Sequence, residues 1–168
     1  MDEIDIGGIP VPDRGPLFLT VLAIHVAAGL TCATCGAAAA LSRKGAARHR
    51  RFGRIYLWAL GVVFASMSVM SVIRRNHNAH LFVIGAAAFA LAMVGYLSRR
   101  RRPYLHIAGL GGSYAALLTG FYVDKGPHLP GRDRLPAWTY WVLPSLIGLP
   151  VIARAIGRRQ PAEGVTSC

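Results

Sequence analysis

The stretch FLTVLAIHVAAGLTCATC, residues 18–35, decides the fold. It is an uncharged run of small and aliphatic residues that carries one imidazole, His25, and two thiols, Cys32 and Cys35. An apolar run of about 20 residues crosses the hydrocarbon core of a bilayer as a helix. The stretch therefore predicts a membrane-spanning helix with a polar side chain inside it.

Four more apolar runs follow the first one. Hydrophobic residues make up 54% of the 168 residues and charged residues only 15%, whereas soluble domains carry about 25% charged residues. A backbone that faces lipid must satisfy its own hydrogen bonds, so each run should be helical. We predict an all-α fold, an integral membrane bundle of five transmembrane helices. The expected spans are residues 16–41, 55–73, 79–98, 104–123 and 137–156.

The basic residues indicate an orientation. Of the 19 Lys and Arg residues, six lie between the first and second runs, four between the third and fourth, and three at the C-terminal end. Cytoplasmic loops carry the excess of positive charge, which places the N-terminus outside and the C-terminus in the cytoplasm. We expect a short external segment (1–15), a five-helix transmembrane domain (16–156) and a cytoplasmic tail (157–168).

The net charge of +12 has the same explanation. The arginines of the chain flank apolar runs, so we expect no nucleic-acid partner. The partners expected instead are the lipid bilayer and, at the basic cytoplasmic loops, anionic lipid headgroups. A homo-oligomer or a larger membrane complex is also compatible with the sequence.

His25 shares a helix face with small residues. The spacing of His25, Gly29, Cys32 and Gly36 puts all four on one side of a helix, and small residues let a second helix approach closely. We therefore expect His25 to point into the bundle. An ionisable residue inside a membrane is a candidate functional residue; the alternative is a neutral histidine that hydrogen-bonds a neighbouring helix. Cys32 and Cys35 could form a redox pair or ligate a soft metal. We expect them instead to behave as small hydrophobic residues.

The fourth predicted span is the most polar. Its polar residues are His106, Ser113, Tyr114, Thr119 and Tyr122, followed by Asp124. With a helical rise of 1.5 Å per residue, Tyr114 should lie level with His25, whereas His106 should lie roughly 15 Å nearer the cytoplasm. The two histidines should therefore not ligate one haem iron, but a quinone, or a haem held by one histidine, stays compatible with the pattern. The predicted cofactor-binding residues are His25, His106, Tyr114, Tyr122 and Asp124.

A second group of polar residues is expected at the outer rim. His77 and His80 are three residues apart at the start of the third run, a workable spacing for metal ligands. Asp124 and His128 are expected on the same side of the membrane. We name His80 and His128 as candidate metal ligands, with solvated rim histidines as the alternative.

Three segments of the sequence are similar to those of a known family. They are ARHRRFGRIYLWA (47–59), HIAGLGGSYAALLTGFYVDKGPHLP (106–130) and WVLPSLIGLPVI (141–152). With the histidine of the first span, this pattern resembles a family of small bacterial integral membrane proteins known only as a domain of unknown function. The resemblance covers about residues 22–152. It implies a multi-pass architecture in the bacterial inner (cytoplasmic) membrane, without a reaction.

Three functional hypotheses follow. The chain is a redox-associated protein that binds a quinone or haem near His25 and the fourth span, a small oligomeric transporter or proton-coupled carrier that uses His25 and Asp124, or a non-catalytic accessory subunit. The sequence contains no hydrolase triad, phosphate-binding loop, zinc-hydrolase motif or paired carboxylates, so we name no catalytic residue.

Overall fold

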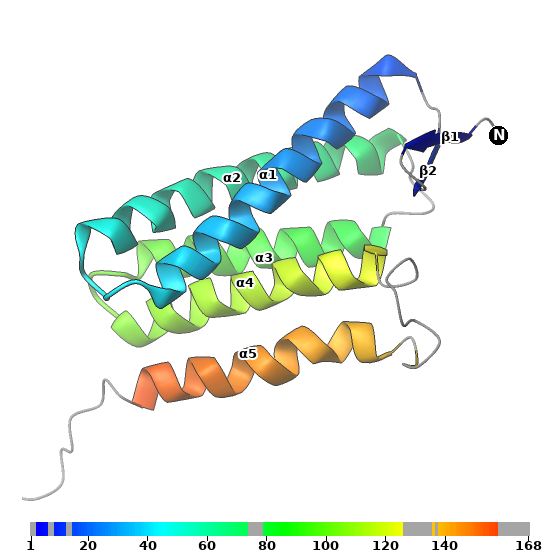
Figure 1. The fold of residues 1–168 in the computed structure, drawn as a ribbon. Coiled ribbons are helices and arrows are strands. Elements are labelled where there is room, and N and C mark those ends of the chain that lie inside the picture. Colours follow the sequence, from blue (N-terminus) through cyan, green and yellow to red (C-terminus); the bar gives the residue numbers. More distant parts are fainter. Residues whose placement is uncertain are drawn as a thin grey trace, which may run out of the picture. The chain divides into compact units, whose positions relative to one another are not determined.

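The computed structural model describes residues 3–6, 9–12, 15–73, 79–125, 136 and 138–157. Within these ranges five helices are present, which confirms the all-α prediction (Figure 1). They are α1 (Pro16–Leu41), α2 (Ala47–Ile73), α3 (Ala79–Leu97), α4 (Pro103–Lys125) and α5 (Thr139–Gly157). A small antiparallel sheet of β1 (Glu3–Ile6) and β2 (Ile9–Pro12) precedes them, in the segment that we expected only to be external.

Four of the described helices, α1, α2, α3 and α5, are long and apolar enough to cross a membrane. The chain is thus a helical protein of the multi-pass membrane class, and these helices imply contact with a lipid bilayer. Although α4 has 23 residues, it is not among the four candidates. Its imidazole, hydroxyl groups and glycines lower its hydropathy below that of the others. Four of the five predicted spans are thus confirmed as helices of sufficient length and hydropathy to cross a membrane.

The largest difference in helix bounds is at α2, which begins at Ala47 rather than at residue 55. The predicted span began where the charges end, because a span is recognised by its apolar run. Arginine, however, is a good helix former. The helix therefore continues through the arginine-rich segment 48–54, outside the apolar part.

The chain divides into two compact units, Met1–Phe82 and Val83–Cys168, and each is described by itself. In the first unit, α1 and α2 are antiparallel neighbours, joined by a turn in which Gly45 has a φ of 85°. This left-handed conformation costs glycine little. The buried residues of α2 recur every three or four positions along one face: Tyr56, Leu60, Val63, Ser66, Met67 and Met70.

The apolar core of this unit lies at the end of the helices away from the turn. Phe18 of α1 packs there with Met67 and Met70 of α2. The partly buried side chains around this cluster are Val21, Leu22 and Leu81. Phe64 and Phe82 stack nearby with their ring centroids 5.8 Å apart.

In the second unit, glycines set how closely the helices approach. A Cβ atom at Gly109 of α4 would lie 2.7 Å from both the Cα and the N atoms of Gly95 in α3. On another side of α4, a Cβ atom at Gly111 would lie 2.6 Å from the side chain of Ile152 in α5. Small residues thus let α4 contact both α3 and α5, as expected of helices packed in a membrane.

We predict that Gly109→Ala destabilises the second unit by about 1–3 kcal/mol, because the new methyl group would overlap backbone atoms that cannot rotate away. Gly112→Ala in the same helix is the control, since its Cβ atom would meet only the flexible end of Leu91 at 3.4 Å. The measurement is unfolding of the purified protein by titration with sodium dodecyl sulfate. Equal stability of the two variants would contradict the close contact.

Candidate functional site

His25 is half-buried on α1, and it bonds to α2. Its Nδ1 atom lies 2.9 Å from the Oγ atom of Ser66. The same Oγ lies 2.7 Å from the carbonyl oxygen of Val62, which can only accept a hydrogen bond. The hydroxyl proton of Ser66 is therefore directed to Val62, and its oxygen accepts from Nδ1–H of His25. In the neutral imidazole this leaves Nε2 as the acceptor nitrogen.

Two other histidines bridge helices in the same way. The Nδ1 atom of His49 lies 2.9 Å from the carbonyl oxygen of Ala39, within the first unit. The Nδ1 atom of His106 lies 2.9 Å from the carbonyl oxygen of Gly95, within the second. Because a carbonyl accepts, Nδ1 carries the proton in both rings. His25, His49 and His106 thus share one tautomer and one way of joining neighbouring helices.

The cysteines also contribute to the contact between α1 and α2. Cys32 is 0% exposed, and its Sγ atom lies 3.6 Å from the carbonyl oxygen of Tyr56. Cys35 is half-buried, and both cysteines are free thiols. A buried thiol against a carbonyl fits the expected role of a small hydrophobic residue with a weak donor.

The predicted cofactor-binding residues of α4 are spread along the helix. Tyr114 and Tyr122 are half-buried, and Asp124 is exposed. Because α4 is one continuous helix, His106 and Tyr122 lie about 24 Å apart along its axis. One cofactor head group therefore cannot touch both. The expected proximity of His25 and Tyr114 joins residues of different units and stays a prediction.

The metal site also stays a prediction. His80 lies exposed at the start of α3, whereas His77 and His128 lie outside the described residues. Within the part of the chain that the structure describes, no three His, Cys, Asp or Glu side chains form a group that could hold a metal ion.

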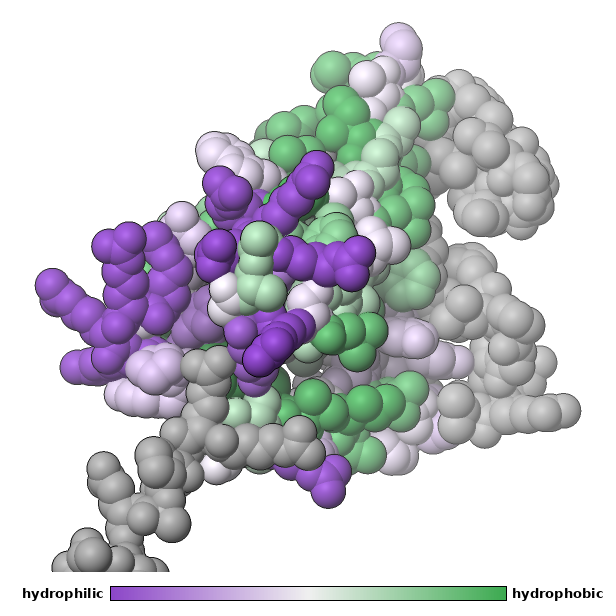
Figure 2. All heavy atoms as spheres, turned by 60° about the vertical axis from the view of Figure 1, so that its left-hand side comes forward, coloured by the Kyte–Doolittle hydropathy of each residue, from purple (hydrophilic) through white to green (hydrophobic). Residues whose placement is uncertain are grey.

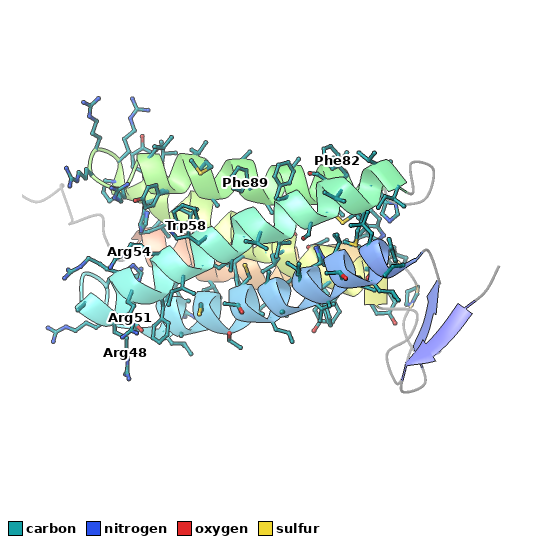
Figure 3. The ribbon with its side chains drawn as sticks, turned by 90° about the horizontal axis from the view of Figure 1, so that it is seen from above. Arg48, Arg51, Arg54, Trp58, Phe82 and Phe89 are labelled. Atoms are coloured by element: carbon teal, nitrogen blue, oxygen red, sulfur yellow. The ribbon has the colours of Figure 1, made fainter. Side chains whose placement is uncertain are left out.

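Two features of the first unit were not singled out by the sequence. The first is Ser66, the partner of His25. The second is an open groove on α2, where Arg51 and Arg54 stand beside Trp58 (Figure 3). Figure 2 shows hydrophilic side chains, in purple, next to hydrophobic surface, in green. The sequence pattern that could have indicated this groove is an arginine pair followed by an aromatic residue on one helix face.

Comparison with known proteins gives no match to a family model, to a curated protein or to a solved structure. The resemblance to a family of bacterial membrane proteins therefore stays a prediction. The fold and the membrane-span candidates are supported by the sequence and structure of this chain alone.

We predict that the double change Cys32→Ala and Cys35→Ala leaves the protein folded, with a loss of about 1 kcal/mol from the small cavity at position 32. Cys32→Leu should be more harmful, because the site is fully buried and a larger side chain overpacks it. Expression and thermal unfolding in detergent check both variants. Loss of activity in a stably folded double variant would instead indicate a redox or metal role.

Proposed function

We propose that the chain is a five-span protein of the bacterial inner membrane, with its N-terminus outside and its C-terminus in the cytoplasm. The observation that supports this orientation is the placement of the arginines. They gather at the α1–α2 connection and in Arg99–Arg102, between α3 and α4. Two spans, α2 and α3, separate these connections, so both fall on one side, the side that the excess of positive charge marks as cytoplasmic.

The packing of α4 supports its role as the fifth span. It contacts α3 through Gly109 and α5 through Gly111. His106 and Thr119 also direct their polar atoms to backbone carbonyls, of Gly95 and Ala115. A span that is covered by protein and has its polar groups paired tolerates a lower hydropathy than one surrounded by lipid.

The topology can be tested by cysteine labelling in a background without native cysteines. We expect Gly131→Cys to react with a membrane-impermeant maleimide in spheroplasts, and Ala47→Cys to react only after the membrane is permeabilised. If α4 does not cross, Gly131→Cys is protected instead. Labelling of Ala47→Cys from outside would show that the orientation is reversed.

For the activity, we propose a redox-associated role in which a quinone or a haem is held beside His25. The supporting observation is the bond from Nδ1–H to Ser66, inside an apolar helix pair. A hydrogen bond of this kind fixes the ring and its tautomer, as the outer partner of a ligating histidine does. It makes Nε2 the nitrogen that would ligate an iron or accept a hydrogen bond from a quinol hydroxyl.

A second candidate function is a non-catalytic accessory subunit of a membrane complex. It is favoured because His49 and His106 join neighbouring helices through bonds to backbone carbonyls, and His25 joins α1 to α2 in a similar way. In this case the imidazole of His25 stabilises the α1–α2 pair. The third possibility, a proton-coupled carrier that uses His25 and Asp124, would require an oligomer because the bundle is small.

His25→Asn separates the first two functions. We expect the purified wild type, from at least one growth condition, to show a haem spectrum or to release a quinone on solvent extraction. We expect His25→Asn to fold but to lose the bound group. His49→Asn is the matched control, because it makes the same substitution at a histidine with a bond of the same kind near the turn, and it should keep the group.

The structural alternative predicts a different result. His25→Leu would lower stability by about 0.6–2 kcal/mol, the range for a hydrogen bond between membrane helices. Ser66→Ala would lower it similarly, and His25→Asn would restore stability and activity together. A wild-type preparation that is colourless and free of quinone under every growth condition would contradict the redox proposal.

A further inference from the structure

The groove on α2 combines a cationic end with an apolar floor. Its lining residues recur at helical spacing along one face of α2: Arg51, Arg54, Ile55, Trp58, Ala59 and Val62. The groove has a volume of about 460 Å³, and it is open to the surroundings. Trp58 is 79% exposed, so the indole projects from the helix (Figure 3).

Within the described ranges, the arginines of the groove have no acidic partner. The chain contains no Asp or Glu between Asp13 and Asp124. Among the residues that the structure describes, the side chains of Arg51 and Arg54 make no hydrogen bond or ion pair, whereas the side chain of the neighbouring Arg50 donates to the carbonyl oxygen of Gly45 at 2.6 Å. The two guanidinium groups are therefore available to an external anion.

The spacing of the groove residues matches the layers of a membrane. Along α2, Trp58 lies about 6 Å beyond Arg54, and Val62 lies about 12 Å beyond it, toward the centre of the apolar run. Tryptophan favours the interface between headgroups and hydrocarbon. The guanidinium groups thus lie at the headgroup level, the indole at the interface, and Ile55, Ala59 and Val62 lead into the acyl-chain region.

We propose that this groove binds one anionic glycerophospholipid. Arg51 and Arg54 hold its phosphate through paired N–H donors, a geometry that a guanidinium offers and an ammonium does not. Trp58 covers the glycerol region, and one acyl chain lies along Ile55, Ala59 and Val62. The proposal rests on the cytoplasmic placement of the α1–α2 connection, and it adds a defined lipid site to the diffuse attraction between basic loops and an anionic leaflet.

The test is a lipid titration followed by native mass spectrometry, with dioleoylphosphatidylglycerol added to the delipidated, detergent-solubilised protein. We expect the double variant Arg51→Gln, Arg54→Gln to bind the first lipid roughly 25-fold more weakly, at about fivefold per arginine. The control is Arg100→Gln, Arg101→Gln, which removes the same charge from the α3–α4 connection and should keep the affinity within about twofold. Arg51→Lys, Arg54→Lys keeps the charge and should still weaken binding, as should Trp58→Leu.

Several outcomes would overturn the site. Equal losses in the two glutamine variants would mean that charge alone attracts the lipid. Equal affinity for dioleoylphosphatidylcholine, or full displacement of the lipid by millimolar inorganic phosphate, would mean that no lipid-specific groove exists. A change of oligomeric state in Trp58→Leu with unchanged lipid binding would assign the groove to a second protein copy.

Maleimide labelling of Ala47→Cys in each variant distinguishes a failure of the lipid-site proposal from a failure of the proposed orientation. Protected Ala47→Cys together with unchanged lipid affinity would refute the lipid site and leave the proposed orientation intact. Accessible Ala47→Cys in the wild-type background would refute the orientation itself.

Discussion

A helix in a bilayer has no water to satisfy its polar groups, and this constraint explains the polar chemistry of the described helices. Most hydroxyl groups return to their own helix: Thr31 bonds the carbonyl oxygen of Ala27, and Thr119 bonds that of Ala115. In contrast, His25, His49, His106 and Cys32 bond to a neighbouring helix. Among the described residues, no buried side-chain nitrogen or oxygen lacks a hydrogen-bond partner.

This difference between hydroxyl groups and imidazoles affects how His25 is interpreted. A hydroxyl can be satisfied by the carbonyl one turn earlier, so it marks no particular neighbour. The imidazoles of His25, His49 and His106 bond instead to a partner on a neighbouring helix. For His25 that partner is Ser66, and the bond orients the imidazole ring. An oriented ring is needed whether His25 joins two helices or ligates a cofactor.

The sequence predicted the parts of the fold that depend on composition. Apolar runs located the helices, because lipid selects for them directly. They did not locate the start of α2, since an arginine-rich segment can be helical outside the membrane. The strand pair β1–β2 was also missed, although Gly7-Gly8 between the strands is a dipeptide common in tight hairpins.

Predicting the candidate site was harder, because partners depend on how two helices are aligned. Ser66 could have been found by folding the sequence back at the turn around Gly45, which brings the middle of α1 beside the middle of α2. The face of small residues around His25 does not specify which helix it meets. The low hydropathy of α4 likewise has its explanation in the glycine contacts with α3 and α5, which cannot be read from a single segment.

The unbroken course of α2 has a mechanical consequence. With 27 residues, α2 is about 40 Å long, against a hydrocarbon core of about 30 Å. Arg51 and Arg54 belong to the same rigid rod as the apolar part, with no joint between them. In a bilayer thinner than the apolar part of α2, residues 55–73, the helix has to tilt or thicken the surrounding lipid, and the arginines have to move with it. The protein would then respond to bilayer thickness as well as to the charge of its lipids.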